Sequence, residues 1–297
     1  MDNLRGSLLM VAAMAAFALE DTLIKLMSAG LPMGQVVAML GCFGALFFGT
    51  LTWARGHRVL APALLSRAVL LRNLGEMIAT ASFVSAIVLT ELASASAILQ
   101  ATPLAVTLGA AIFLGESVGW RRWTAIGVGF AGVLLIIRPG LEGFTPASLF
   151  AVLAVAGLAL RDLSVRAVPA SVTSGQLSTW GFATVIPTGL LMMLAMGAGP
   201  EWPTPADMAR LAGAVVVGVC GYYAIVAATR TGEVSVVVPF RYTRLIFALI
   251  LGMVVFGERP DALMLTGAAL IVGAGLYTIW REARAAPAPA AETSGWN

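Results

Sequence analysis

Two arginines, Arg241 and Arg244, stand three residues apart within a long apolar stretch of the sequence. Residues at this spacing lie on one face of a helix, so both guanidinium groups would point the same way. Cations at that depth need an acidic side chain from another helix, or the carboxylate or phosphate of a bound molecule. Pro239 precedes them and favours a bend, because it removes one backbone hydrogen bond. The spacing therefore predicts either an internal salt bridge or an anion-binding site.

Acidic side chains that can balance these arginines occur near the N-terminus. Asp21 and Lys25 are four residues apart, a favourable geometry for an ion pair within one helix. Glu20 has no such neighbour, so we expect it either to pair with an arginine from another segment or to carry an exchangeable proton.

A third apolar stretch contains Arg72, Asn73 and Glu76. Arg72 and Glu76 are four residues apart, so one interpretation is a structural ion pair. The other is that Glu76, beside the amide of Asn73, holds the ammonium group of a bound molecule or titrates. The sequence leaves these two interpretations open.

Gln100 and several aromatic residues complete the candidate binding groups. Gln100 lies in the middle of another apolar stretch. Trp180, Tyr222 and Tyr242 can stack on a flat ring or on a cation, although Trp and Tyr also serve as anchors at membrane interfaces. The predicted substrate-binding residues are Asn73, Glu76, Gln100, Trp180, Tyr222, Arg241, Tyr242 and Arg244, with Glu20 and Glu76 as candidate proton carriers.

The composition indicates which elements must position these groups. Hydrophobic residues make up 59% of the 297 positions and charged residues only 11%, whereas a soluble domain has about 25% charged residues. Continuous apolar stretches of about 20 residues recur along the chain, which is the length of a membrane-spanning helix. The predicted fold is an all-α integral membrane protein with ten transmembrane helices, at residues 6–27, 33–53, 68–89, 93–114, 122–138, 147–165, 174–197, 208–229, 234–256 and 261–280.

The two halves of the chain resemble each other. Phe113–Glu116 is followed by a short polar turn and a glycine-rich apolar run, and Val255–Glu258 is followed by a similar turn and run. The two Gly-Glu pairs are 142 residues apart. Because each half contains five spans, the second half must enter the membrane from the opposite face, as in many transporters. The predicted units are residues 1–140, an inverted copy at 141–282, and a disordered cytoplasmic tail at 283–297.

Basic residues segregate to one side of this topology. The side that holds both termini carries Arg5, Arg55, Arg58, Arg67, Arg121, Arg122, Arg166, Arg230, Arg281 and Arg284. The opposite side carries Lys25, Arg138, Arg210 and Arg259, together with several acidic residues. Because cytoplasmic loops carry an excess of Lys and Arg, both termini are predicted to lie in the cytoplasm.

The sequence shows no arrangement typical of catalysis. It contains no cluster of metal ligands, no phosphate-binding loop and no paired serine and histidine within an apolar segment. We therefore expect no catalytic residue, no cofactor and no metal, and a protein that is not an enzyme. The arginines are scattered singly, so no nucleic-acid partner is expected. The expected partners are a small-molecule substrate and the lipid bilayer; the oligomeric state stays open, a monomer included.

Several motifs along the chain point to a known family. They are Phe17–Lys25, Gly30–Pro32, Phe113–Trp123, Ile136–Gly140, Val238–Arg244, Phe256–Asp261 and Gly267–Gly275. In their order and spacing they resemble the drug/metabolite transporter superfamily, in its EamA-domain branch. The resemblance covers nearly the whole chain and implies ten helices in two inverted halves, a central substrate path, and export or import of small metabolites. The match is to bacterial members, which implies the inner membrane, and exporters of aromatic amino acids are the first members to compare.

The leading hypothesis is a carrier that exports amino acids, including aromatic ones, by alternating access through a central cavity between the two repeats. In this hypothesis Arg241 and Arg244 hold the carboxylate, and Glu76 or Glu20 holds the ammonium group or a coupling proton. The alternative is a carrier of cationic drugs, or of phosphorylated or adenosylated metabolites. A third class, an intramembrane enzyme or a non-transporting assembly protein, is disfavoured because catalytic groups are absent and polar side chains lie at depth.

Overall fold

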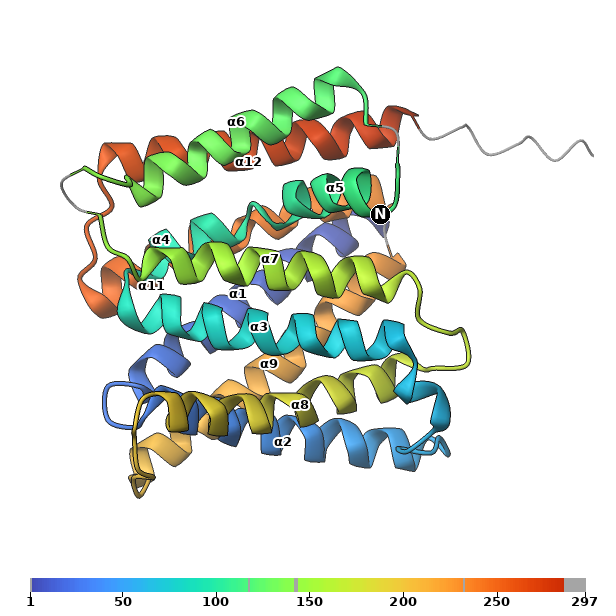
Figure 1. Cartoon of the computed structure of the whole chain (residues 1–297), viewed down its shortest axis with the longest axis vertical. Helices are drawn as coiled ribbons and strands as arrows, with labels where there is room; N and C mark the ends of the chain where they lie inside the picture. Colours follow the sequence, from blue (N-terminus) through green and yellow to red (C-terminus); the bar gives the residue numbers. More distant parts are fainter. Residues whose placement is uncertain (1, 117, 142–143, 232, 286–297) are drawn as a thin grey trace, which may run out of the picture.

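The computed structural model describes residues 2–116, 118–141, 144–231 and 233–285, and all regular structure in these ranges is helical. The elements are α1 (Asp2–Met27), α2 (Met33–Ala54), η1 (Pro62–Leu65), α3 (Arg67–Leu89), α4 (Leu92–Leu99), α5 (Thr102–Phe113), α6 (Trp120–Ile137), α7 (Ser148–Val165), α8 (Ser174–Ala195), α9 (Pro205–Thr231), α10 (Val234–Val237), η2 (Val238–Tyr242), α11 (Thr243–Phe256) and α12 (Ala262–Ala285). The long helices pack side by side, with α2 and α8 at one edge of the bundle and α6 and α12 at the other (Figure 1).

These helices have the dimensions of membrane spans. Nine helical segments in the described part of the chain are long and apolar enough to cross a membrane, with α4 and α5 counted together and η2 and α11 counted together. The tenth is α3, whose 23 residues give a length of about 35 Å, although it also contains Arg72, Asn73 and Glu76. Backbone groups in a membrane must be paired internally, which a helix achieves along its own length. The prediction of an all-α, multi-pass membrane protein is confirmed.

The contacts between helices follow a two-fold pattern. In the two five-span repeats α1 corresponds to α7, α2 to α8, α3 to α9, and α6 to α12. The main helix pairs are α2 with α8, α6 with α12, α1 with α9, and α3 with α7. The pairs α2–α8 and α6–α12 each join a helix to its counterpart in the other repeat. The pairs α1–α9 and α3–α7 are equivalent to each other, because the repeat exchanges α1 with α7 and α9 with α3. This is the arrangement that an inverted repeat about an axis in the membrane plane produces.

Glycines allow the closest of these helix contacts. A Cβ atom added to Gly75 in α3 would lie 2.7 Å from the carbonyl oxygen of Gly157 in α7. Gly132 in α6 and Gly267 in α12 meet in the same way, each with an added Cβ 2.6 Å from the other's carbonyl oxygen. Small residues stabilise helix pairs in membranes because they let the backbones approach. These contacts also fix how each helix is rotated, and therefore where its polar side chains point.

The fourth and ninth spans are both interrupted near their middles, whereas the sequence predicts one continuous helix at 93–114. α4 ends at Leu99 and α5 begins at Thr102, with Pro103 in its first turn. In the ninth span α10, η2 and α11 follow one another, and Pro239 lies in η2. Proline has no N–H group to donate and its ring clashes with the preceding turn, so it kinks or breaks a regular helix. Corresponding interrupted helices at the centre of two repeats are typical of transporter binding sites.

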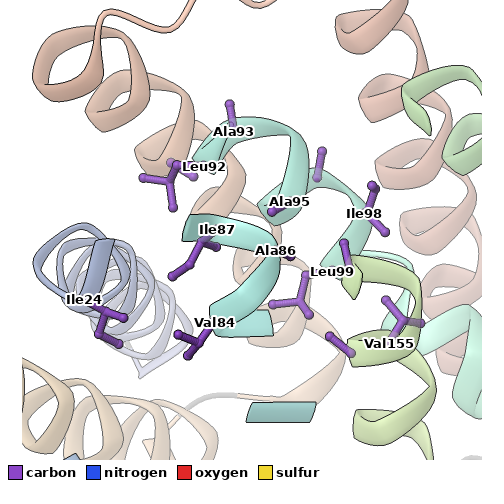
Figure 2. Close-up of a cluster of buried hydrophobic side chains, with 14 of the residues drawn as sticks. Ile24, Val84, Ala86, Ile87, Leu92, Ala93, Ala95, Ile98, Leu99 and Val155 are labelled. Atoms are coloured by element: carbon purple, nitrogen blue, oxygen red, sulfur yellow. The ribbon is translucent and has the colours of Figure 1, made fainter. Parts of the chain in front are cut away.

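Apolar side chains close one end of the bundle, around α4. Ile24 of α1, Ile87 of α3, and Leu92 and Ile98 of α4 belong to one core cluster and are at most 7% exposed (Figure 2). Val155 of α7 packs into the same cluster. Such complete burial seals the bundle at this end, which is the end where α1 finishes.

The C-terminal segment differs slightly from the prediction. α12 continues to Ala285 and so includes the first three residues of the tail that the sequence predicts to start at residue 283. The remainder of the predicted tail, residues 286–297, lies outside the described residues. The N-terminus of the chain and the end of α12 lie on the same side of the bundle (Figure 1), as an even number of spans requires.

Candidate functional site

A cavity of about 720 Å³ lies at the centre of the bundle, beside the interruptions of the fourth and ninth spans. It begins at Leu99 and Gln100 and extends to Arg166 and Ser174, where α7 ends and α8 begins. Arg166 and Ser174 are exposed, so the cavity opens at this end, opposite the sealed one. Of the predicted binding residues, it is lined by Gln100, Tyr222, Arg241, Tyr242 and Arg244.

Arg241 projects into the cavity from η2 and is exposed there. Its guanidinium group makes no hydrogen bond or ion pair with any residue that the structure describes. Its backbone carbonyl accepts a hydrogen bond from Nε2 of Gln100 at 3.3 Å. This bond connects the interrupted part of the ninth span to the interrupted part of the fourth. This arginine is therefore free to bind an anion.

Arg244 lies one turn further along and is already neutralised. Its Nη2 atom is 2.7 Å from Oδ2 of Asp21, whose side chain is 6% exposed. The guanidinium group also lies between the rings of Phe17 and Phe83, at 5.7 and 5.5 Å from their centroids. Arg244 therefore makes the internal salt bridge, one of the two alternatives predicted for this pair, and it also lies on the cavity wall.

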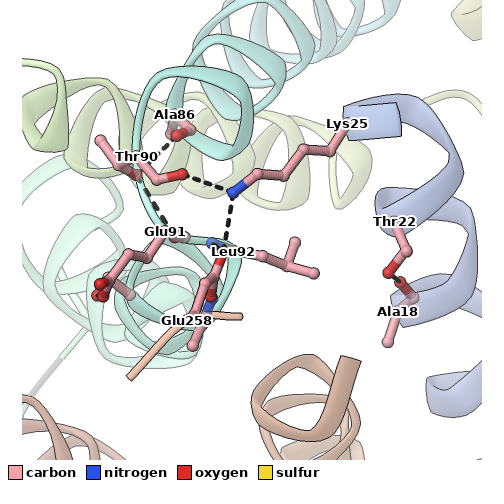
Figure 3. Close-up of polar contacts among 10 residues, drawn as sticks. Ala18, Thr22, Lys25, Ala86, Thr90, Glu91, Leu92 and Glu258 are labelled. Carbon is pink, nitrogen blue, oxygen red and sulfur yellow. Dashed lines mark hydrogen bonds and ion pairs between the residues drawn. The ribbon is translucent and has the colours of Figure 1, made fainter. Parts of the chain in front are cut away.

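The predicted ion pair between Asp21 and Lys25 is not present, because each residue has a partner on a different segment. Lys25 Nζ is 2.9 Å from Oε1 of Glu258 and donates a hydrogen bond to the carbonyl of Thr90 at 2.8 Å (Figure 3). Glu258 also accepts hydrogen bonds from the backbone N–H groups of Leu92 and Ala93, at 2.6 and 3.0 Å. One carboxylate therefore caps the start of α4 and joins three segments at the sealed end.

Glu76 lies between two arginines. It is 3.1 Å from Nη2 of Arg72 and 3.6 Å from Nη1 of Arg161. Arg72 donates a further hydrogen bond to Oδ1 of Asn73 at 3.0 Å, and Arg161 pairs with Asp162 at 2.8 Å. Arg72, Arg161 and Asp162 line the cavity, so the structure places Glu76 and Asn73 behind them, in the ion-pair arrangement that the spacing of Arg72 and Glu76 predicts.

The predicted aromatic residues occupy different positions. Trp180 donates a hydrogen bond to the carbonyl of Val59 at 2.9 Å and packs outside the residues that line the cavity. Tyr222 lines the cavity, and its hydroxyl accepts a hydrogen bond from Ser178 at 3.3 Å. Tyr242 is 8% exposed and packs against Gly275, where an added Cβ would overlap its hydroxyl. Tyr222 is therefore the predicted aromatic residue best placed to meet a substrate.

Glu20 faces a smaller space beside the main cavity, among aromatic rings. It makes no hydrogen bond or ion pair within the described part of the chain. No group of three or more His, Cys, Asp or Glu residues converges among the described residues in a way that could hold a metal ion.

Sequence reasoning missed several residues at the two ends of the cavity. Glu258 belongs to the repeated Gly-Glu pair, which looks like a loop boundary in the sequence. Its counterpart Glu116 pairs with Arg166 at 2.6 Å, at the open end, with both side chains about half exposed. The repeat itself was the signal: two acidic residues at corresponding positions, each meeting a basic residue from the other half.

Comparison with known proteins agrees with this architecture. The model of the EamA-like transporter family matches residues 4–138 and again residues 145–280. The chain belongs to the EamA-like transporter family. A riboflavin transporter of Rhizobium johnstonii is 27% identical over 289 residues, covering 96% of this chain and 94% of the relative. A pseudopaline exporter of Pseudomonas aeruginosa is 30% identical over 277 residues, covering 90% of this chain and 93% of the relative.

Two further proteins are similar to this EamA-like transporter. An S-adenosylmethionine uptake transporter of Rickettsia bellii is 29% identical over 195 residues, which is 65% of each chain. One solved crystal structure is 20% identical with a TM-score of 0.59, over 95% of this chain and 99% of that chain, and shares the fold. The family and the relatives' names indicate a transporter of small metabolites rather than an enzyme, in a bacterial membrane.

Proposed function

We propose that this EamA-like transporter carries metabolites that join an anionic group to a flat heteroaromatic ring, with adenosylated amino acids such as S-adenosylmethionine as the representative class. A cavity of about 720 Å³ is within the range of sites for drug-sized ligands, and larger than a free amino acid needs. Phe17 and Tyr222 on its wall can stack on a ring. Relatives named for riboflavin and S-adenosylmethionine support a substrate of this size.

The observation that carries this proposal is the state of Arg241. Arg72, Arg161, Arg166 and Arg244 also line the cavity, but each pairs with an acidic side chain. Arg241 has no such partner among the described residues, although it lies beside the point where the two interrupted spans meet. A carboxylate or phosphate of the substrate would supply that partner through a charge-assisted hydrogen bond.

The arrangement of the two ends supports alternating access. The bundle is sealed where Lys25 meets Glu258 and open where Arg166 meets Glu116. If both termini lie in the cytoplasm, as the distribution of arginines predicts, the cavity faces the cytoplasm in this structure. If the open end then closed and the sealed end opened, the cavity would face the other side of the membrane, and the substrate would have been carried across.

Transport by purified protein in proteoliposomes tests this proposal. We expect saturable uptake of labelled S-adenosylmethionine by the wild type. The Arg241→Gln variant should lower kcat/KM about 10- to 100-fold, the value of a lost hydrogen bond to a charged group. Arg230→Gln, which changes an exposed arginine at the end of α9, is the matched control and should transport normally. Absence of saturable uptake, or normal uptake by Arg241→Gln, would refute the proposal.

Export of amino acids, including aromatic ones, is the second candidate. Arg241 and the ring of Tyr222 are also the groups that an aromatic amino acid would need. Labelled phenylalanine and tryptophan in the same proteoliposomes distinguish the two. Saturable phenylalanine transport that excess S-adenosylmethionine does not inhibit would favour the amino-acid function.

A further inference from the structure

A second pocket of about 100 Å³ adjoins the main cavity between α1, α2, α8 and α9. Four aromatic rings line it, from Phe17, Phe48, Phe182 and Tyr222, together with the carboxylate of Glu20. Phe48 stacks on Phe182 at a centroid distance of 5.4 Å and meets Tyr222 edge-on at 5.2 Å. Phe17 and Tyr222 also line the main cavity, so the two spaces lie next to each other and share these two rings as a common border.

Glu20 has no charge partner in this pocket. It makes no hydrogen bond or ion pair with a described residue, and the nearby Arg244 is held by Asp21 at 2.7 Å. Its carboxylate rests against the backbone of α9 at Gly218, where an added Cβ would lie only 2.7 Å from Oε1. An ionised carboxylate that is removed from water without a partner is costly. A proton or a bound cation from outside the protein would offset that cost.

The groups around Glu20 favour a cation as that partner. Helices α2 and α8 contribute only apolar or aromatic side chains and a glycine: Leu40, Gly44, Phe48 and Phe182. Helix α9 contributes Tyr222, whose hydroxyl is already bonded to Ser178. A carboxylate among several aromatic rings is the kind of site that binds quaternary ammonium and related cations. About 100 Å³ corresponds to about three water molecules, enough for a cationic group but not for a nucleoside.

We propose that this pocket, the Glu20 subsite, binds the cationic group of the substrate, an ammonium or a sulfonium, while the anionic group of the same molecule lies at Arg241. This inference rests on the proposed function, because it assigns the second half of the substrate. Each end of a bipolar metabolite then meets a charged side chain that has no ion-pair partner among the described residues: Glu20 meets the cation and Arg241 meets the anion.

Thermal unfolding of the purified full-length protein tests the Glu20 subsite without a transport assay. The probes are choline and its uncharged isostere 3,3-dimethylbutan-1-ol, because they have the same shape and differ in charge. A ligand that binds the folded state raises Tm, so choline should raise the wild-type Tm and the alcohol should not. Glu20→Gln should weaken choline binding about tenfold or more, because the opposite charge is lost while the size is kept. Gly218→Ala should also weaken it, because the added methyl group occupies the space of the carboxylate.

Several outcomes would overturn the Glu20 subsite. These are equal Tm shifts from choline and the alcohol, no choline shift in the wild type, or a full choline shift in Glu20→Gln. Arg241→Gln separates this proposal from the proposed function. It should lower kcat/KM for the anionic substrate about 10- to 100-fold but leave the choline shift unchanged. If Arg241→Gln transports normally while the choline shift still depends on Glu20, anion binding at Arg241 is refuted and the Glu20 subsite is not.

Discussion

Neutralising Glu258 should open the end of the transporter that the structure shows sealed. In Glu258→Gln the side chain keeps its shape but loses its charge. The carboxylate now accepts hydrogen bonds from Lys25 Nζ at 2.9 Å and from the backbone N–H groups of Leu92 and Ala93 at 2.6 and 3.0 Å. The glutamine amide has one oxygen and one NH2 group. At one of the two positions that the carboxylate oxygens occupy now, an N–H group would therefore face another hydrogen-bond donor. The substitution therefore removes the ion pair and at least one capping bond of α4.

The magnitude follows from the burial of this cluster. The Lys25 and Glu258 side chains are 15% and 6% exposed, so water replaces the lost bonds poorly while this end stays closed. A hydrogen bond to a charged group contributes about 1.5–3 kcal/mol, and Lys25 keeps its bond to Thr90. A loss of about 3 kcal/mol from the closed form is therefore expected, on the order of a 100-fold change in the ratio of closed to open molecules.

Distances between spin labels at Ala29 and Arg259, both exposed at this end, measure that ratio by pulsed electron resonance. Cys42 and Cys220, the free cysteines, are first replaced by serine. We expect a longer distance population in Glu258→Gln. Glu116→Gln is the matched control at the open end, where the corresponding pair is about half exposed and worth about 1 kcal/mol or less. An unchanged distance distribution in Glu258→Gln, or an equal change in Glu116→Gln, would show that this cluster does not hold the end closed.

Three further substitutions test other parts of the structure. Gly75→Ala places a methyl group 2.6 Å from a backbone nitrogen of α7 and should destabilise the fold by about 1–3 kcal/mol. Gly273→Ala is its control: the added methyl group meets nothing within 4 Å, so Tm should be unchanged or slightly raised. Trp180→Phe removes one hydrogen bond outside the cavity; it should lower stability by about 1 kcal/mol without changing KM, and a raised KM would place Trp180 at the substrate. The hydrogen bond from Arg138 lowers the pKa of Asp261 below its ordinary 3.8. A lowered pKa stabilises the folded state above the ordinary pKa, and this effect is lost as pH falls through the lowered pKa. The Tm advantage of the wild type over Asp261→Asn should therefore begin to shrink at about pH 4 and disappear at lower pH. A constant Tm difference across this pH range would contradict that assignment.

Part of the candidate site could be recognised from the sequence, because insertion into a membrane makes deep charges rare. Arg241 stood out by its depth within an apolar stretch, and the structure places it on the cavity wall. The spacing of Arg72 and Glu76 predicted their ion pair, since residues four apart on one helix meet whatever the helix packs against. The same rule failed for Asp21 and Lys25, because partners on other segments are available to both.

The sequence by itself determined the membrane setting, the helical spans and the inverted repeat, since these depend on apolar length and on the order of segments along the chain. Only the tertiary structure decided which charges stay unpaired, because that depends on how each helix is rotated. Glycine contacts such as Gly75 with Gly157 set this rotation. Packing gave Asp21, Glu76 and Glu258 protein partners and left Glu20 and Arg241 without an ion-pair partner in the part of the chain that the structure describes. It also showed that the two repeated Gly-Glu pairs, which look like loop boundaries in the sequence, each meet a basic residue of the other half: Glu258 meets Lys25 and Glu116 meets Arg166.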